Sequence, residues 1–413
     1  MIDKEQQELL QKLLEKKKAG TLTPAERYKI PPQDMPEQDP QVRKRNVNEV
    51  ATGYTETHAR IEALRCLRCK TAPCVKGCPV QIRIKEFVES IAEGNYSQAL
   101  SIIKENSLLP AVCGRVCPHP CETDCNRKNK DGSVSINAME RYVGDFGIEK
   151  ELKLTRLSED AKSEKIAIIG SGPAGLSCAY QLARQGYPVT VFEAFSQPGG
   201  MLRYGIPKYR LPREILDAEI QRIADLGVEL KCNFVVGKDA TLDQLREEYK
   251  AIFVGIGAHK GYNLGVPGED ASNVFTGTEF LNKANCGEPL EIGEKVVVIG
   301  GGDTAIDAAR VSKRLGADVT IIYRRTRNEM PAIAPESRSA KVAGVDAEAK
   351  RLFTGSRRAF SLWLTRIAMR VPYTADSLLR NLQRPDLTLP QMLPALLPLW
   401  WYHLPVLSCI PAF

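Results

Sequence analysis

Histidine and cysteine are both scarce over most of this chain. Only four of its 413 residues are histidine, and His119 alone lies among closely spaced cysteines. Because zinc sites commonly combine cysteine pairs with histidine, this scarcity argues against a zinc knuckle. Eight of the twelve cysteines fall between residues 66 and 125, whereas secreted disulfide scaffolds are cysteine-dense throughout. The distribution argues against a disulfide framework and predicts metal binding in a reducing, cytoplasmic compartment.

A surplus of basic residues is absent from most of the chain, although the net charge is +7. Residues 338–413 carry ten Lys or Arg and four Asp or Glu, a balance of +6, so residues 1–337 carry only about +1. All three tryptophans also lie in that tail, and no glycine follows Gly355. A basic surface for nucleic acid is therefore not expected. The change near residue 336 predicts an aberrant tail over 337–413, typical of a shifted reading frame, with a genuine but unusual tail as the alternative.

Charged residues are missing after Asp386, which leaves a stretch long enough to suggest a membrane span. Prolines recur throughout this stretch and would break a helix repeatedly, so we expect no membrane span. They are Pro390, Pro394, Pro398, Pro405 and Pro411. At the other end, no signal peptide is expected, and the leucines within residues 5–18 have helical spacing. That spacing predicts an amphipathic surface or docking helix.

The order of the remaining motifs predicts an α/β protein with an N-terminal α-helical domain. Residues 1–60 have the pattern of a helix and a proline-rich extended segment, and residues 61–150 that of helices around the cysteines. From Lys165 onward, short apolar strands alternate with helices, which indicates two Rossmann-like nucleotide-binding units. The first unit covers 160–288. The second, over 289–336, is incomplete because the tail follows it.

The first glycine-rich loop, GSGPAG, lies between an apolar strand and a helix. Its glycines permit a tight turn, close approach of the backbone to a pyrophosphate, and packing of the helix on the strand. Glu193 ends the next strand and is placed to accept hydrogen bonds from a ribose diol. A glycine-rich turn without a ligand is the alternative. The residues predicted to contact this dinucleotide are Gly170, Gly172, Pro173, Ala174, Gly175 and Glu193, together with Gly199 and Gly200 of a later loop.

The second glycine-rich loop, GGGDTA, is followed by a strand that ends in Arg324 and Arg325. Guanidinium groups at this position would bind a 2′-phosphate that a carboxylate would repel, so this site is predicted to take NADP(H). A solvated strand end is the alternative. Two dinucleotide sites in one chain suggest a flavin and a nicotinamide that exchange hydride. The loop residues predicted to contact the nicotinamide dinucleotide are Gly300, Gly302, Asp303, Thr304 and Ala305.

The cysteines form two runs of four upstream of these loops. Thiolates ligate both zinc and iron, so the spacing alone leaves both metals open. Iron–sulfur clusters can pass single electrons onward from a flavin that receives hydride, whereas zinc is redox-inert. The position beside a flavin unit therefore favours iron–sulfur clusters. The first run is Cys66, Cys69, Cys74 and Cys78, and the second is Cys113, Cys117, Cys121 and Cys125.

Five motifs, in this order, resemble the small (β) subunit family of NADPH-dependent glutamate synthase. Related proteins are the flavin subunit of ferredoxin:NADP transhydrogenase and the N-terminal part of dihydropyrimidine dehydrogenase. The resemblance spans residues 25 to about 335 and implies FAD at the first loop, NADPH at the second, and two [4Fe–4S] clusters. The motifs are RCLRCKTAPCVKGCPV, CGRVCP, IGSGPAGLSCAYQLARQGYPVTVFEA, GGMLRYGIPKYRLP and VVVIGGGDTAIDAARVSKRLGADVTIIYRRTRNEMPA.

The same resemblance implies that the two cysteine runs cross over to hold the clusters. One cluster would be bound by Cys66, Cys69, Cys74 and Cys125. The other would be bound by Cys78, Cys117, Cys121 and the non-cysteine ligand Glu140. Cys113 would not be a ligand. The gap of three residues between Cys117 and Cys121 is shorter than the five found in several relatives, which makes Cys121 a less secure ligand.

The resemblance implies an oxidoreductase in which NADPH passes hydride to FAD and electrons leave through the clusters. The predicted role is that of the glutamate synthase (NADPH) small subunit, whose partner is the glutamate synthase large (α) subunit. One alternative is the flavin subunit of NADH-dependent ferredoxin:NADP transhydrogenase, with a ferredoxin-linked flavoprotein subunit as its partner. The other is a truncated, non-catalytic cluster-binding fragment. Hydride transfer itself needs no acid or base on this chain, so no catalytic residue is predicted.

Overall fold

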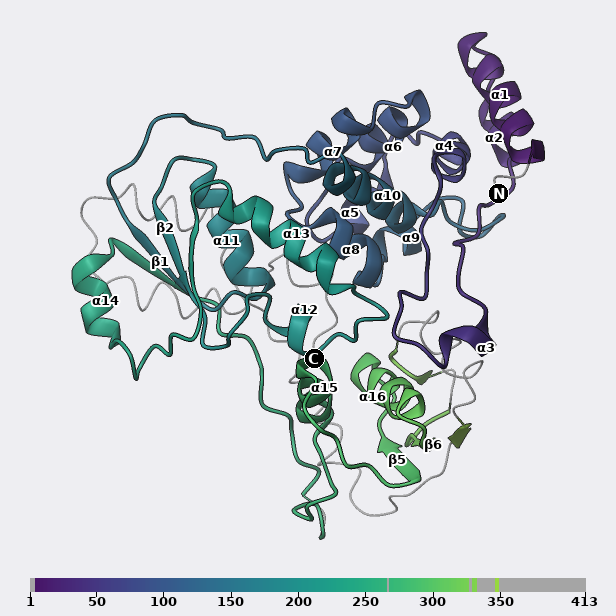
Figure 1. The fold of residues 1–413 in the computed structure, drawn as a ribbon. Coiled ribbons are helices and arrows are strands. Elements are labelled where there is room, and N and C mark those ends of the chain that lie inside the picture. Colours follow the sequence, from purple (N-terminus) through teal and green to yellow (C-terminus); the bar gives the residue numbers. More distant parts are fainter. Residues whose placement is uncertain (1–3, 266, 327–328, 333–345, 349–413) are drawn as a thin grey trace.

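The structure is a computed structural model that describes residues 4–265, 267–326, 329–332 and 346–348. A helical domain comes first, a four-stranded parallel sheet with helices follows, and a smaller parallel sheet comes last (Figure 1). This arrangement confirms the predicted fold class. The predicted tail over 337–413, with its apolar proline-rich stretch, lies outside the described residues except for 346–348. Among the described residues, no helix is long and apolar enough to cross a membrane.

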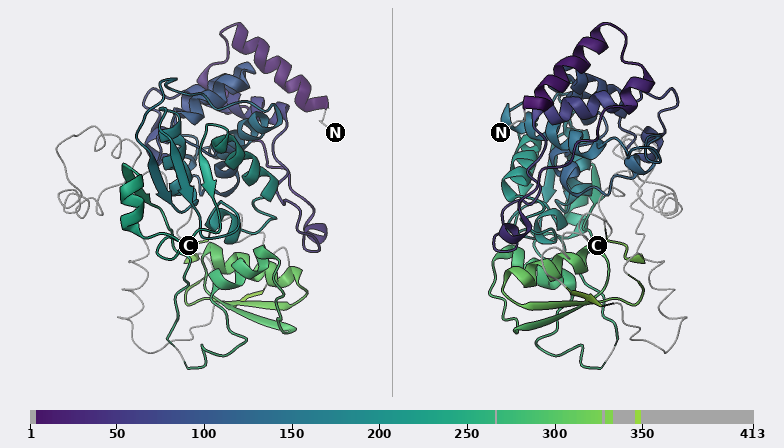
Figure 2. Two further views of the ribbon diagram at one scale, coloured as in Figure 1. Left: turned by 60° about the vertical axis from the view of Figure 1, so that its left-hand side comes forward. Right: turned by 90° about the vertical axis from the view of Figure 1, so that its right-hand side faces the viewer.

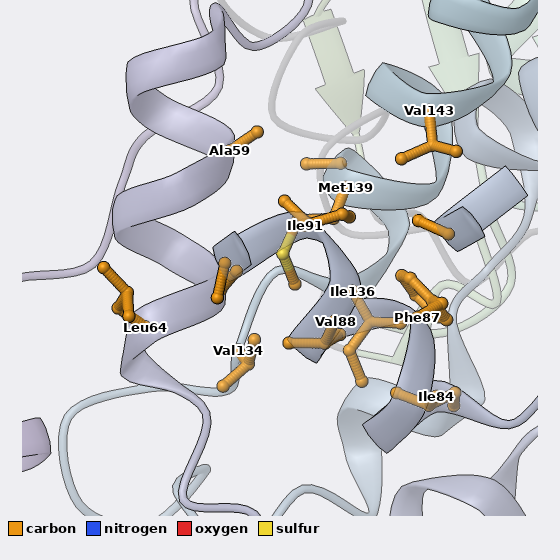
Figure 3. Close-up of a cluster of buried hydrophobic side chains, with 14 of the residues drawn as sticks. Ala59, Leu64, Ile84, Phe87, Val88, Ile91, Val134, Ile136, Met139 and Val143 are labelled. Carbon is orange, nitrogen blue, oxygen red and sulfur yellow. The ribbon is translucent and has the colours of Figure 1, made fainter. Parts of the chain in front are cut away.

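Short helices make up the described chain up to residue 150. They are α1 (Lys4–Lys18), α2 (Pro24–Tyr28), α3 (Pro40–Arg43), α4 (Glu56–Arg65), α5 (Pro73–Gly77), α6 (Ile84–Glu93), α7 (Tyr96–Lys104), α8 (Pro110–Val116), α9 (Pro120–Thr123) and α10 (Ile136–Glu149). The apolar faces of α1, α4, α6, α7 and α10 share one core, in which Phe87 and Ile91 of α6 pack with Met139 and Val143 of α10 (Figure 3). Leu10 of α1 joins the same core, as the helical spacing of its leucines predicts.

Helices α8 and α10 cross at unusually close range because each contributes a glycine to the crossing. A Cβ at Gly114 would lie 2.4 Å from the Cα of Arg141, and a Cβ at Gly144 would lie 2.3 Å from the backbone nitrogen of Ala111. Any larger residue at either glycine would therefore push the helices apart. This crossing fixes the cysteines at the end of α8 relative to Glu140 on α10.

The larger sheet forms the core of the first nucleotide-binding unit. Its strands are β1 (Ile166–Ile169), β2 (Val189–Phe192), β3 (Glu229–Lys231) and β4 (Ala251–Val254), all parallel, in the order β3-β2-β1-β4. Its helices are α11 (Pro173–Ala183), α12 (Met201–Tyr204), α13 (Arg213–Ala224) and α14 (Leu242–Glu248). Every residue of β1 and β2 is buried, which is typical of a parallel sheet covered on both faces.

The helical domain and this sheet share apolar packing. Val112 and Val116 of α8 belong to the same buried cluster as Ile168 of β1 and Leu176 of α11. Figure 1 shows α11 and α13 between the sheet and the helical domain. The cysteine-bearing helices are thus packed directly against the first nucleotide-binding unit.

The second unit is smaller. It contains α15 (Gly277–Cys286), β5 (Lys295–Ile299), α16 (Asp303–Arg314), β6 (Asp318–Ile322) and β7 (Asp346–Glu348), with parallel strands in the order β5-β6-β7. Strand β7 pairs with β6 ten residues beyond the predicted end of this unit at residue 336. The βαβ order of β5, α16 and β6 matches the prediction, because the glycine loop and the apolar runs mark both strand ends.

An extended segment connects the helical domain to the second unit. It begins after α2 and includes α3, which lies beside α16 (Figure 1). Figure 2 shows the smaller sheet at the opposite end of the molecule from α1. The segment is held there by Asn46, whose carbonyl accepts a hydrogen bond from Arg314 Nε at 2.8 Å. We refer to residues 31–54 as the strap.

Candidate functional site: two cysteine sites and two glycine loops

Four cysteines from both runs surround one cavity in the helical domain. Cys66, Cys69, Cys74 and Cys125 line it together with apolar side chains, including Ile84 and Val88 of α6. Cys66 follows α4, Cys74 lies on α5 and Cys125 follows α9, and α5 packs against α9. The structure therefore brings together the four residues predicted to hold the first cluster.

The surroundings of these thiols disfavour free thiolates and suit thiolates that bind a metal group. Burial raises the pKa of the Cys66 thiol, and burial beside Cys66 and Cys125 raises the pKa of Cys74 to about 12. Asn126 Nδ2 donates a hydrogen bond to Cys69 Sγ at 3.2 Å. Thiols crowded together in this way are costly to ionise alone, and they are stabilised when they bind iron. The cavity therefore fits an iron–sulfur cluster.

The second group of predicted ligands is also brought together, and it is more deeply buried. Cys78, Cys117 and Cys121 are 5%, 6% and 8% exposed, and Glu140 is 7% exposed. Burial, followed by the charges of Glu122, Glu140 and Cys117, raises the pKa of the Cys121 thiol. Burial and nearby Cys117 likewise raise the pKa of Glu140 well above its ordinary value. A buried carboxyl beside three thiols fits a site that gains a cationic centre.

Cys113 lies close to this second group, although it is predicted not to be a ligand. Ser107 Oγ lies 3.5 Å from Glu140 Oε1 and 4.0 Å from Cys113 Sγ, so its one hydroxyl proton can be donated to either of them. Burial and then the charge of Glu140 raise the pKa of the Cys113 thiol. Sequence reasoning did not identify Ser107, because a lone serine between two helices carries no spacing signal. The second group thus offers one thiol more than the predicted ligand set.

The loops that carry the cysteines adopt left-handed backbone at non-glycine residues, which is uncommon and concentrates at functional sites. These residues are Arg68, Ala72, Gln81 and His119. At His119 the turn points its backbone N–H to Cys117 Sγ at 3.4 Å. Within the described residues, no group of three or more His, Cys, Asp or Glu side chains has the geometry of a single-metal site.

The first glycine loop joins β1 to α11 and leaves the N-terminus of the helix open. Gly172 caps α11 without a side-chain hydrogen bond. A Cβ at Gly175 would lie 1.9 Å from the carbonyl oxygen of Gly170, so only glycine permits the turn. Pro173 and Ala174 form the first turn of the helix. Free backbone N–H groups at this terminus are suited to a pyrophosphate.

The loop with Gly199 and Gly200 lies against the first glycine loop. A Cβ at Gly200 would lie 2.7 Å from the Cα of Gly172, and Gly199 N donates to the carbonyl oxygen of Ser171 at 3.1 Å. The two loops that the sequence predicts to contact one dinucleotide therefore lie side by side in the structure.

Glu193 ends β2 beside this loop, and its carboxylate is held by the chain itself. Its Oε2 accepts hydrogen bonds from the backbone N–H of Ser171 at 2.9 Å and from the Ser171 hydroxyl. Its Oε1 accepts from Phe195 N at 2.9 Å. A carboxylate offers about four acceptor positions, so capacity for a ribose hydroxyl remains. Sequence reasoning did not identify Ser171, which occupies a variable position of the glycine motif.

The second glycine loop joins β5 to α16 and has the same design. Gly300 has φ 144°, Gly302 caps α16 without a side-chain hydrogen bond, and Asp303 begins the helix. Within the described part of the chain, no atom lies within 4 Å of the position that a Cβ of Gly302 would take. Thr304 and Ala305 follow in the first turn. The space over this loop is open to a phosphate group.

Arg324 and Arg325 follow β6 after one intervening residue, Tyr323. The strands β5 and β6 are in parallel register, with Ile299 paired to Ile322, and Gly300 N donates to the carbonyl oxygen of Ile322 at 3.0 Å. The carboxyl ends of neighbouring parallel strands meet at one edge of the sheet. The two arginines therefore lie at the same edge as the loop, as the sequence predicts.

Two family models match the chain in the order of these sites. Residues 43–152 match the model described as dihydropyrimidine dehydrogenase domain II with a 4Fe–4S cluster, and residues 164–348 match the pyridine nucleotide-disulphide oxidoreductase model. The second match ends at the last residue of β7.

Curated relatives carry both regions. The NADPH-Fe(3+) oxidoreductase subunit beta of Geobacter sulfurreducens is 45% identical over 284 residues, which cover 67% of this chain and 42% of the relative. The NAD-dependent dihydropyrimidine dehydrogenase subunit PreT of Escherichia coli is 40% identical, with 72% and 73% covered. The E. coli glutamate synthase [NADPH] small chain is 36% identical, with 76% and 69% covered.

This chain belongs to the glutamate synthase (NADPH) small-subunit family of iron–sulfur flavoproteins. The match to PreT, at 40% identity over nearly three quarters of both chains, is sufficient to show it. The predicted resemblance is confirmed, and the two family models agree with the predicted order of an iron–sulfur domain followed by a pyridine nucleotide domain. The chain spans about two fifths of the length of the Geobacter relative. The predicted ligands and the predicted domain boundaries stay predictions.

Proposed function

We propose that this chain oxidises NADPH and delivers the electrons singly to a partner subunit. The observation that carries the proposal is a cavity lined by four thiols in the same chain as two glycine loops that open helix N-termini. A bound flavin and iron–sulfur clusters would supply the conversion of hydride chemistry into single-electron transfer. Two clusters, rather than one, are part of the proposal because the thiols divide into two groups.

The chain's own residues would bind and orient these groups. Gly170 to Gly175 and Glu193 would hold FAD, and Gly300 to Ala305 would hold the pyrophosphate of NADPH. Arg324 and Arg325 would bind the 2′-phosphate through charge-assisted hydrogen bonds. The packing of α8 against the first unit through Val112 and Val116 would keep the second cysteine group close to the flavin unit.

The finer proposal is the role of a glutamate synthase small subunit, with the glutamate synthase large (α) subunit as the partner. The small chain of E. coli supports it through matches over 69% of its length. Subunits with other names are more similar to this chain, and the flavin subunit of a ferredoxin:NADP transhydrogenase is the alternative. Purified large subunit should restore glutamate formation from 2-oxoglutarate and glutamine if the finer proposal holds.

A second candidate function is a cluster-binding fragment that does not oxidise NADPH. It is favoured by apolar strand residues that face solvent in the described structure: Val254 of β4 is 54% exposed, and Val297 and Ile299 of β5 are 58% and 56% exposed. Complete nucleotide-binding sheets bury such side chains. In this case the clusters assemble while the nucleotide sites stay without function.

One anaerobic titration separates the two candidates. The chain is reconstituted with iron, sulfide and FAD, and NADPH is added while flavin absorbance is followed. Bleaching of the flavin with stoichiometric NADPH supports the oxidoreductase. Intact cluster absorbance without bleaching supports the fragment. Failure to bind iron, sulfide and flavin at all would sink both.

A further inference from the structure

The two cysteine groups differ in their access to solvent. Cys66, Cys69, Cys74 and Cys125 are each partly exposed, whereas Cys78, Cys117 and Cys121 are buried. Of these buried cysteines, Cys117 directly follows α8, which packs against the first nucleotide-binding unit, whereas Cys78 follows α5 and Cys121 lies on α9. Since electrons tunnel most readily over short distances, the partly exposed group is the one that a partner protein can approach.

The chain around the partly exposed cysteines is rich in cations. Residues 66–85 contain five Lys or Arg and no Asp or Glu, and residues 125–130 contain three more and no acid. The three arginines among them are neutralised, because Arg68 pairs with Glu89 at 3.1 Å and Arg83 pairs with Glu105 at 2.5 Å. Arg127 pairs with Asp131. The lysines show no such ion pair among the described residues. They are Lys70, Lys76, Lys85, Lys128 and Lys130.

Of these lysines, Lys85 lines the cavity, and the other four are exposed and lie within five residues of a cavity cysteine in the sequence. Lys70 directly follows Cys69, Lys76 lies on α5 two residues after Cys74, and Lys85 lines the cavity itself. Lys128 N donates to the carbonyl oxygen of Cys125 at 3.0 Å. We call these five residues the lysine rim. Two exposed acids, Glu86 and Asp124, lie in the same region, so the rim keeps an excess of positive charge.

The lysine rim is not needed to balance the negative charge of a bound cluster, because buried arginines lie nearby. Arg27 is 7% exposed, and it donates a hydrogen bond to the carbonyl oxygen of Cys66 at 3.0 Å. Its guanidinium also lies close enough to the Cys66 sulfur to attract a negative charge there. Arg127 is fully buried beside it and donates to the carbonyl oxygen of Arg65 at 2.5 Å. Interior guanidiniums are therefore already present. The lysines, with flexible stems and solvated ammonium groups, are suited to meet a protein surface.

An open hollow adjoins the cavity on the same surface. It is lined by three cations, Arg68, Arg83 and Lys85, of which Arg68 and Lys85 also line the cysteine cavity. The rest of its lining consists of the acids Glu86 and Glu89 and of Ser90, Gln98 and Ile102. Its volume is about 420 Å³. A concave surface next to partly exposed thiols gives a partner both a place to seat and a short route to the cluster position.

We propose that the lysine rim is the docking surface for a small acidic electron-carrier protein, which exchanges one electron at a time with the group held by Cys66, Cys69, Cys74 and Cys125. The proposal rests on the proposed function, because it concerns where electrons leave the chain. Complementary charge steers such encounters and raises association rates by about 10-fold to 1,000-fold at low ionic strength. The reduced chain loses one electron and the carrier gains it, with no other reactant.

The test uses the cluster-loaded full chain reduced with dithionite, so that it does not depend on NADPH or on FAD. Stopped-flow absorbance follows its oxidation by an acidic flavodoxin and, separately, by a basic cytochrome c. We expect the second-order rate constant with flavodoxin to fall by about tenfold or more between about 20 mM and 300 mM salt. The rate constant with cytochrome c should stay level or rise.

Charge reversal at the rim supplies the matched comparison. Lys70→Glu/Lys76→Glu/Lys128→Glu should slow oxidation by flavodoxin about tenfold or more at low salt and remove its salt dependence. The same three changes at exposed lysines of the nucleotide-binding units, Lys238→Glu/Lys250→Glu/Lys260→Glu, should leave the rate within about twofold. Iron content and cluster absorbance verify that each variant stays loaded.

Equal rates for the rim variant and the control variant would overturn the proposal, as would a flavodoxin rate that does not depend on salt. If the triple rim variant does not fold, Lys128→Glu alone and the salt series of the unmodified chain give the same decision. Failure of NADPH to reduce the chain would overturn the proposed function. The docking test could still be interpreted, because it uses dithionite as the reductant.

Discussion

Lys104 Nζ of α7 lies 2.9 Å from Glu219 Oε2 of α13. This ion pair links the helical domain to the first nucleotide-binding unit. Both side chains are buried. The same ammonium donates to the carbonyl oxygen of Leu108 at 3.0 Å, and Glu219 Oε1 accepts from Ala111 N at 3.3 Å. The pair therefore anchors the start of α8, the helix that leads to Cys113 and Cys117.

Removing one partner of this pair should be costly. Lys104→Met leaves Glu219 buried with less compensation, so we expect the free energy of unfolding to fall by about 3 to 5 kcal/mol. Urea denaturation followed by circular dichroism measures it. The exposed pair Lys150–Glu149 is the control, since Lys150→Met should cost less than about 1 kcal/mol. Similar losses in both variants would contradict a structural role for the buried pair.

The division of the cysteines into two groups predicts selective loss of clusters. Cys78→Ser should lower bound iron from about eight to about four atoms per chain, because only the second group loses a ligand. Cys69→Ser should also lower bound iron to about four atoms per chain. The cluster that remains should give a different electron paramagnetic resonance signal from the one that remains in Cys78→Ser. Cys113→Ser is the matched control and should keep both clusters. Loss of all iron, or of none, in Cys78→Ser would show that the groups are not separate.

Arg324 and Arg325 predict a preference for the 2′-phosphate. Arg324→Ala/Arg325→Ala should raise the apparent KM for NADPH by about tenfold or more, since each charge-assisted hydrogen bond contributes about 1.5 to 3 kcal/mol. The KM for NADH should change little, and kcat should be preserved with both. Flavin reduction followed by stopped flow gives these values. An equal rise of KM for NADPH and NADH would mean that the arginines act on the fold and not on the phosphate.

The cluster-free chain should lose stability at alkaline pH. Burial beside Cys66 and Cys125 raises the pKa of Cys74 from 9.0 to about 12. The folded chain therefore holds this proton more tightly than the unfolded chain, and the free energy of unfolding falls as pH rises from 9 toward 12. Urea midpoints at several pH values in this interval measure the slope. Cys74→Ala should show a shallower decline, and coincident slopes would exclude Cys74 as a contributor.

Much of the local structure could be predicted because the signals are local. The apolar run before GSGPAG marks β1, and the loop fixes the start of α11 at Pro173. The same reasoning placed β5, α16 and β6. In each case a strand, a glycine turn and a helix lie within about thirty residues, so hydrophobic period and turn chemistry suffice.

Contacts between distant segments could not be predicted. Lys104 and Glu219 are 115 residues apart, and Asn46 and Arg314 are 268 residues apart. No periodicity links such positions, because the contact arises only after whole units pack together. The place of Cys113 beside Glu140 is of this kind, since the crossing of α8 and α10 creates it. Strand β7 also lay beyond the sequence signals, in a stretch whose composition suggested an aberrant tail.

The residues of the strap are synthesised long before some of the residues that they contact in the folded chain. Val50 N donates to the carbonyl oxygen of Tyr209 at 3.0 Å, and Asn46 is bound by Arg314 of α16. A ribosome adds about 5 to 20 residues per second, so these early residues leave the tunnel many seconds before either binding partner exists. The strap can contact the helical domain early, for example through Glu49 and Arg115. Its contacts with Tyr209 and Arg314 form only after those residues have emerged, so a segment made early gains its last contacts late.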